Sequence, residues 1–268
     1  MIEAQSGGRG DTPLVFVHGG SASWRMGKDF LDALPGRVRW WAVDLPGHGA
    51  SPWTPGRYDL RGVGAALAEW AAGHLDRPAW WYGHSYGGQA ALAAAGVRPD
   101  AFAGLVIGDA PLAPARMYRL LDRMSGTLRR WQGWCGRPEE ELVRLLGAED
   151  AGGGRTRAEV LGAAHPYLVG QAAALHRHDP AFIEALLTES QQVYGHLGHA
   201  GEWIAGVPGP VLLLRADPAV MSLSSAEDEA LVRSAARHPA VTTVSGVGHG
   251  LHQFAPAEVA ATISALIP

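Results

Sequence analysis

The chain has 268 residues, of which 47% are hydrophobic and 18% are charged, so it can bury a sizeable core and is not disordered. A net charge of −4, with scattered lysine and arginine, provides no basic surface for nucleic acid. The single cysteine excludes an intrachain disulfide, and neither a signal-peptide pattern nor an apolar run of roughly 18 residues is present. We therefore expect a soluble, cytoplasmic protein without a nucleic-acid or membrane partner; its oligomeric state stays open.

Short apolar segments alternate with longer helical patterns along most of the chain. The expected strands are 13–17, 38–43, 79–82, 104–108, 211–215 and 241–245. The expected helices are 60–74, 87–97, 226–237 and 256–266. Most of the strands are apolar on both faces, which is typical of parallel strands buried beneath helices. The pattern predicts an α/β fold with a mostly parallel sheet flanked by helices.

Residues 111–205 interrupt this alternation. They contain helical patterns but no convincing strand, and the turn-rich segment 206–210 (GVPGP) returns the chain to strand patterning. The simplest arrangement is a helical cap inserted after the strand that ends near 108, with residues 1–110 and 206–268 forming the core. Insertions at the carboxyl ends of parallel strands are where such folds build ligand sites.

The segment 83–87 (GHSYG) matches the G-x-S-x-G pattern of a nucleophile elbow. A strand that turns directly into a helix forces the corner residue, Ser85, into a strained positive-φ conformation, so the residues two positions away must be small. Gly83 and Gly87 meet that demand. The corner would expose the serine hydroxyl and direct the backbone N–H of Tyr86 at a bound substrate.

A serine hydroxyl needs an adjacent base, and that base needs an acid to orient it. His249 follows an expected strand in a glycine-rich loop, at the sheet edge where we expect Ser85, whereas His252 is interpreted as a packing residue. Two aspartates, Asp109 and Asp217, stand at strand ends in the chain order Ser…Asp…His. We favour Asp217 as the acid, with Asp109 as the alternative; the aspartate that is not the acid would cap a turn before proline.

Two backbone donors are needed to hold an oxyanion. The first is the N–H of Tyr86. The second is expected from the loop after the first strong strand, where glycines allow close approach, and we favour Gly20 with Ser21 as the alternative.

These segments together resemble the α/β-hydrolase superfamily, and within it the cap-bearing serine esterase and lipase-like members. The residues that carry the resemblance are His18-Gly19-Gly20, 44–51 (DLPGHGAS), the elbow at 83–87 and Gly248-His249. The resemblance runs over nearly the whole chain and implies Ser85 as nucleophile, His249 as base, and Gly20 and Tyr86 as oxyanion donors.

The sequence departs from the family pattern at two places. Only about a dozen residues precede the strand at 13, so we expect one or two N-terminal edge strands to be missing. The penultimate strand runs directly into Arg215-Ala216-Asp217 without the glycine turn that commonly precedes the acid, which keeps Asp109 as a candidate.

Aromatic residues of the cap and of the loop after Gly20 could line a pocket above Ser85. The candidates for substrate binding are Trp24, Trp131 and Trp134. The histidine pairs at 176/178 and 196/199 lack a carboxylate or cysteine at ligand spacing, so no metal site is expected.

The sequence predicts a serine hydrolase that cleaves a carboxylic ester or lactone through an acyl-enzyme intermediate, with no cofactor. The apolar cap indicates a substrate with a hydrophobic part. The alternatives are another Ser-His reaction on the same fold, such as carbon–carbon bond hydrolysis, acyl transfer or a lyase reaction, and a non-catalytic ligand-binding module.

Overall fold

A computed structural model describes residues 1–267. Its main sheet has seven strands in the order β1-β3-β2-β4-β5-β8-β9, and all neighbours are parallel except the antiparallel edge pair β1–β3. These strands are β1 (Ala4–Gly7), β2 (Thr12–Val17), β3 (Val38–Val43), β4 (Ala79–His84), β5 (Phe102–Gly108), β8 (Val211–Ala216) and β9 (Pro239–Val244). The predicted fold class, an α/β fold with a mostly parallel sheet flanked by helices, is confirmed.

All six strands expected from the sequence are present, but β1 was not anticipated. It is short, contains a glycine and is partly exposed, so it lacks the apolar run that marks the other strands. The sheet therefore begins with one antiparallel edge strand, ahead of the first strand expected at 13.

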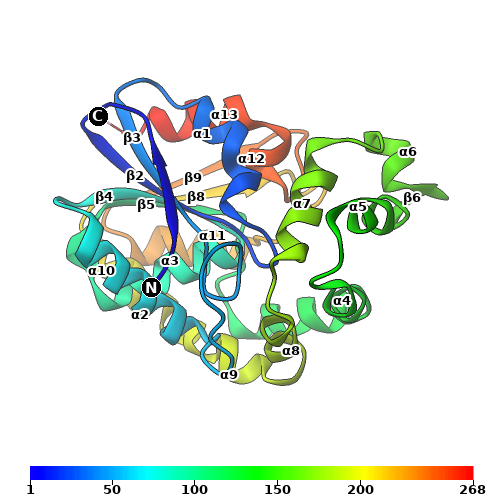
Figure 1. The fold of residues 1–268 in the computed structure, drawn as a ribbon. Coiled ribbons are helices and arrows are strands. Elements are labelled where there is room, and N and C mark those ends of the chain that lie inside the picture. Colours follow the sequence, from blue (N-terminus) through cyan, green and yellow to red (C-terminus); the bar gives the residue numbers. More distant parts are fainter. Residues whose placement is uncertain (268) are drawn as a thin grey trace.

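Helices cover both faces of the sheet (Figure 1). One face packs against the helices α2 (Leu60–His74), α3 (Tyr86–Val97), α10 (Ala200–Gly206) and α11 (Ala226–Ala235). The other face packs against α1 (Lys28–Asp32), α12 (Leu251–Phe254) and α13 (Pro256–Ser264). Two short 3₁₀ helices, η1 (Trp24–Gly27) and η2 (Pro99–Ala101), complete this part of the chain.

Strand β4 shows why the sheet needs two covers. Trp81 faces the core beneath α2 and α3, whereas Trp80 and Tyr82 face the core beneath α1 and α13. All three side chains are buried, and successive side chains of a strand point to opposite faces. The strand that leads to Ser85 is therefore fixed on both sides.

Between β5 and β8 the chain forms mostly helices, which we call the helical insertion (residues 111–205). Its elements are α4 (Pro114–Trp134), α5 (Glu139–Gly147), β6 (Asp150–Gly152), β7 (Arg155–Thr156), α6 (Arg157–Leu161), α7 (Pro166–His176), α8 (Pro180–Thr188), α9 (Ser190–Tyr194), η3 (Gly195–His199) and most of α10, which returns to the core and packs on α3 and α11. The small antiparallel pair β6–β7 lies where no strand was expected. In Figure 1, α4 to α7 stand to one side of the main sheet. The division of the chain into core and cap domains stays a prediction.

Within residues 1–267, no helix combines the length and apolar character that a membrane crossing requires.

Candidate functional site

Ser85 occupies the corner between β4 and α3. Its backbone has φ 53° and ψ −123°, a left-handed conformation that a non-glycine residue adopts only under constraint. A Cβ on Gly83 would overlap the carbonyl oxygen of Gly87, and a Cβ on Gly87 would overlap the carbonyl oxygens of Val17 and His18. The steric demand predicted for the elbow is therefore present, and Ser85 itself is only half-buried.

His249 lies in the loop between β9 and α12, and its Nδ1 is 2.8 Å from Oδ2 of Asp109. Asp109 is fully buried directly after β5, with φ 44°. The N–H of Ser85 donates to the carbonyl of Gly108 at 2.7 Å, so the nucleophile candidate and the start of the acid loop belong to one hydrogen-bonded pair of strands.

The Asp109 carboxylate is surrounded by donors. Its Oδ1 accepts hydrogen bonds from the Ser222 hydroxyl at 2.6 Å and from the N–H groups of Ala216 and Ser224, and its Oδ2 accepts the N–H of Leu223 at 2.9 Å. Burial alone would raise the pKa of Asp109, but the hydrogen bond and charge of His249, with the bonds from Leu223 and Ser222, hold the pKa below its usual range. The carboxylate is therefore ionised and fixed in orientation.

Asp217, the aspartate that we favoured from the sequence, does not contact His249. Its Oδ2 accepts the N–H of Gly246 at 2.7 Å and its Oδ1 accepts the N–H of Ala219 at 2.8 Å. These two bonds lower the pKa of the Asp217 carboxylate, which is partly exposed and caps a turn. The choice of Asp217 is thus corrected by geometry: the carboxylate placed against His249 belongs to the alternative, Asp109.

His84, the residue before Ser85, is a further site residue that sequence reasoning missed. Its Nε2 donates to the carbonyl oxygen of His249 at 2.7 Å, and the two rings are 4.6 Å apart. Burial, with the charge of His249, lowers the pKa of His84 to about 3, so His84 is neutral. The hydrogen bond from His84 therefore links the His249 loop to the elbow.

The Ser85 hydroxyl makes no hydrogen bond within residues 1–267. Catalytic hydrogen bonds often tighten only when substrate binds.

The two expected oxyanion donors lie side by side. A Cβ placed on Gly20 would be 3.6 Å from the Cβ of Tyr86, and one on Gly19 would be 3.4 Å from the Cβ of Ser85. The N–H of Ser21 donates to Nε2 of His48 at 3.1 Å, so this alternative donor is already occupied. In the described part of the chain no acceptor takes the N–H of Gly20, which favours Gly20.

The Tyr86 side chain points away from a polar role. It is buried, its hydroxyl donates to the carbonyl of Tyr58 at 3.1 Å, and its ring packs edge-on against Phe182 of α8. Its backbone N–H belongs to the first residue of α3, next to Ser85, where helix N–H groups have no partner within the helix.

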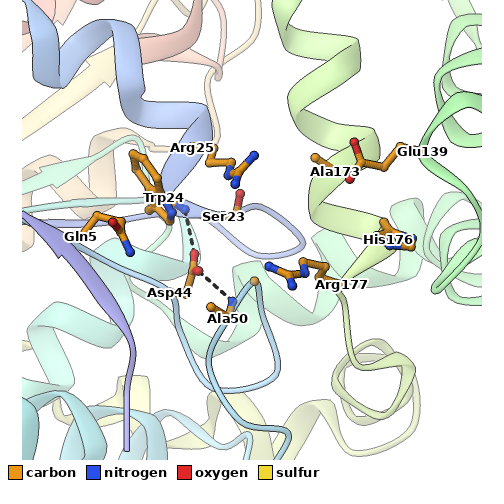
Figure 2. Close-up of a pocket in the computed structure, with 11 residues that line it drawn as sticks. Gln5, Ser23, Trp24, Arg25, Asp44, Ala50, Glu139, Ala173, His176 and Arg177 are labelled. Atoms are coloured by element: carbon orange, nitrogen blue, oxygen red, sulfur yellow. Dashed lines mark hydrogen bonds between the residues drawn. The ribbon is translucent and has the colours of Figure 1, made fainter.

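The three tryptophans proposed for substrate binding have different surroundings. Trp131 is buried within the insertion and donates from Nε1 to Glu149 at 3.1 Å, and Trp134 packs partly buried against the same core. Trp24 lines a cavity of about 480 Å³ between the core and α7 (Figure 2). Figure 2 also shows Asp44 joined to the N–H groups of Trp24 and Ala50. Ser85 and His249 do not line this cavity, so a role for these tryptophans at Ser85 stays a prediction.

Of the histidines considered as metal ligands, His176, His178 and His199 make hydrogen bonds within the protein. Nδ1 of His176 lies 2.8 Å from the carbonyl of Arg137, and His178 is buried between Ser21 and the backbone of Asp179. Across residues 1–267, no group of three histidine, cysteine, aspartate or glutamate side chains is arranged to hold a metal ion.

The sheet topology and the strand-to-helix corner place the chain among the α/β hydrolases. The model of the alpha/beta hydrolase family matches residues 14–262, and the chain belongs to this family. It is similar to the pimeloyl-[acyl-carrier protein] methyl ester esterase of Methylococcus capsulatus, with 36% identity over 103 residues, 38% of each chain. It is also similar to the lipase LipV of Mycobacterium tuberculosis, with 32% identity over 120 residues, 44% of this chain and 45% of LipV.

The matched segments thus span less than half the length of these two curated relatives. Among solved structures, Est816, described as an N-acyl homoserine lactone degrading enzyme, superimposes with a TM-score of 0.70 over 99% of this chain and 96% of its own. Its sequence identity is 16%, so this likeness concerns the fold.

Proposed function

We propose that the protein is a serine hydrolase that cleaves a carboxylic ester or lactone. The observation that carries this proposal is the strained Ser85 corner together with the 2.8 Å contact between His249 and Asp109. A charged carboxylate bonded to Nδ1 orients the imidazole and leaves Nε2 free to act as a base. Asp109 is proposed as the acid in place of Asp217.

The proposed reaction begins with attack of Ser85 Oγ on the substrate carbonyl carbon while His249 Nε2 accepts the hydroxyl proton. The negative charge that develops on the carbonyl oxygen is held by the N–H groups of Gly20 and Tyr86. His249 then donates its proton to the leaving alcohol, which departs and leaves an acyl-serine. A water molecule, activated by the same histidine, hydrolyses the acyl-serine and restores Ser85.

The proposed substrate class is supported by the names of the relatives and by the apolar side chains of the insertion. The relatives are named as a methyl ester esterase and a lipase, and the fold is shared with a lactone-degrading enzyme, so an ester or lactone carbonyl is proposed as the reacting group. The insertion is rich in buried apolar side chains that are continuous with the core beneath α2 and α3. This supports a hydrophobic acyl or alcohol part.

Covalent labelling tests the proposal. A fluorophosphonate probe is expected to modify the wild-type protein at Ser85, and Ser85→Ala should lose both the label and the hydrolysis of an activated ester. Ser234→Ala, at an exposed serine of α11, is the matched control and should retain both.

A panel of esters, lactones, amides and diketones, run on wild type and Ser85→Ala, then assigns the reaction. Turnover of diketones but not esters would indicate carbon–carbon bond hydrolysis instead. If the wild-type protein takes up no label and hydrolyses no activated ester, the serine-hydrolase proposal is wrong.

A further inference from the structure

Ser21, the residue after the proposed oxyanion donor Gly20, has φ 54° although it is not glycine. The left-handed conformation costs a non-glycine residue about 1–2 kcal/mol, so it persists only where neighbours hold it. Ser21 is buried, with 2% of its surface exposed. Contacts with neighbouring residues must therefore hold the backbone of Ser21 in this conformation.

Every polar group of Ser21 is engaged. Its N–H donates to His48 Nε2 at 3.1 Å, its hydroxyl lies 3.0 Å from His178 Nε2, and its carbonyl accepts the side-chain amide of Gln171 at 2.6 Å. His48 belongs to the core loop 44–51, whereas Gln171 lies on α7 and His178 in the link from α7 to α8. Two of the three anchors thus come from the helical insertion.

The direction of each hydrogen bond is fixed by the next partner. His178 Nδ1 donates to the carbonyl of Asp179 at 2.9 Å, and burial lowers the pKa of His178 to about 4, so the ring is neutral and its Nε2 accepts the proton of the Ser21 hydroxyl. His48 Nδ1 likewise donates to the carbonyl of Pro46, which leaves its Nε2 as the acceptor for the Ser21 N–H. Both histidines are therefore neutral, and each contact has one donor and one acceptor.

The insertion also packs directly on the proposed donors. Phe182, in the first turn of α8, lies 3.8 Å from the Cβ position of Gly20, and its ring meets that of Tyr86 edge-on at 5.1 Å. The N–H of Asp179, just before α8, donates to the carbonyl of Gly47 at 2.8 Å. The start of α8 therefore packs against the core next to the place where the insertion hydrogen-bonds to Ser21.

We propose that Gln171 and His178 are positioning residues that hold the oxyanion loop (residues 18–21) in its working conformation, so that seating of the insertion and assembly of the oxyanion hole are coupled. Gly20 lacks a Cβ and has soft dihedral angles, so its N–H direction depends on its neighbours. The position of Gly20 is fixed on one side by the chain that leaves β2 and on the other side by Ser21. If the insertion lifts, Ser21 loses two anchors and relaxes, and the Gly20 N–H turns away. The inference rests on the proposed function.

The test compares two glutamines of the insertion. Gln171→Met removes the amide that binds the Ser21 carbonyl at nearly constant side-chain volume. Gln132→Met is the matched control, because Gln132 donates to Glu184 on the exposed side of the insertion. Each protein is titrated with a fluorophosphonate, so that kcat on an activated ester is expressed per reactive site.

For Gln171→Met we expect kcat per reactive site to fall about tenfold with KM within about twofold, because a displaced oxyanion donor weakens transition-state binding only. Amide hydrogen exchange at residues 18–21 should become faster. Gln132→Met should match the wild type in both measurements. A residue with a structural role alone would lower the number of reactive sites and leave kcat per site unchanged.

Ser21→Ala removes the bond to His178 and retains Gln171, so it tests the second anchor if Gln171→Met does not fold. It should lower kcat about threefold, again with little change in KM. An unchanged kcat per site in either folded variant, or an effect confined to KM, overturns the inference while the serine-hydrolase proposal stands. A wild-type protein without label or ester hydrolysis overturns both.

Discussion

The candidate site has two halves that are built from different parts of the molecule. The proposed acid–base half consists of Asp109 and His249, which follow the core strands β5 and β9, and Asp109 is held by core residues 216–224. The oxyanion half consists of Gly20, Ser21 and Tyr86, and the helical insertion contributes two of the three anchors of Ser21. The donors that hold Asp109 are thus core residues, although Arg116 of α4 donates to the carbonyl of Leu223 at 2.7 Å, whereas two of the anchors of Ser21 are residues of the insertion itself.

The two halves also differ in charge. Asp109 is buried as an anion because His249 and several donors stabilise its charge. His48 and His178, beside the oxyanion loop, are buried as neutral rings because burial lowers the pKa of His178 to about 4 and that of His48 well below its ordinary value. Substitutions and acid should therefore act on the two halves in different ways.

The largest effect is expected from the acid–base half. Asp109→Asn should lower kcat about 10³- to 10⁴-fold, because an amide cannot stabilise the imidazolium and favours the wrong tautomer of His249. Asp217→Asn should change kcat by no more than about twofold, since Asp217 only caps a turn. Steady-state kinetics of both variants on one activated ester measures the contrast.

Folding must be matched for this comparison, so the thermal midpoint of each variant is measured in parallel. Similar small losses in both variants would contradict the assignment of Asp109. A large loss in Asp217→Asn alone would restore the aspartate that the sequence favoured.

How far the sequence predicts this site depends on how local each constraint is. The elbow was predictable because the two glycines that it requires, Gly83 and Gly87, stand two residues from Ser85 in the printed chain, even though Gly87 is needed for close approach to the carbonyls of Val17 and His18. The acid was not, because Asp109 and Asp217 both follow strands that end at the same edge. What separates them is burial and the donors of the 222–224 loop, which depend on tertiary packing.

The residues that hold the oxyanion loop were even harder to predict from the sequence than the acid. Ser21 and His178 are 157 residues apart, and no short spacing links them. His178 was instead weighed with His176 as a metal ligand, because a histidine pair is all that the local sequence shows. A positive φ at Ser21, a non-glycine residue, carries no signal in the chain at all.

Acid should act on the buried neutral histidines, of which His178 is one, before it acts on Asp109. His178 is fully buried with a pKa of about 4, whereas in the unfolded chain its pKa returns to about 6.5, so the unfolded state takes up the proton first. The free energy of unfolding should therefore fall as pH drops from about 6.5 to about 4, by up to about 1.4 kcal/mol per pH unit for this group. Urea unfolding at pH 7, 6, 5 and 4.5 measures the slope.

His178→Gln should reduce that slope, and His238→Gln, at an exposed histidine, should leave it unchanged. Asp109 has the opposite sign: its lowered pKa contributes stability that is present above about pH 4 and is lost only below it. Identical slopes in wild type and His178→Gln would mean that His178 is not buried as a neutral ring.

Within the acid–base half a smaller effect is expected at Ser222, whose hydroxyl donates to Oδ1 of Asp109 at 2.6 Å and helps to keep Oδ2 turned toward His249. Ser222→Ala should lower kcat about fivefold, close to 1 kcal/mol, because the backbone N–H groups of Ala216 and Ser224 still hold Oδ1. Ser225→Ala is the matched control, since Ser225 binds Asp228 at the start of α11 and should change stability without changing kcat. If Ser222→Ala keeps full activity, backbone donors alone orient Asp109. The acid–base half would then depend on the path of the chain after β8, just as the oxyanion half depends on the seating of the insertion.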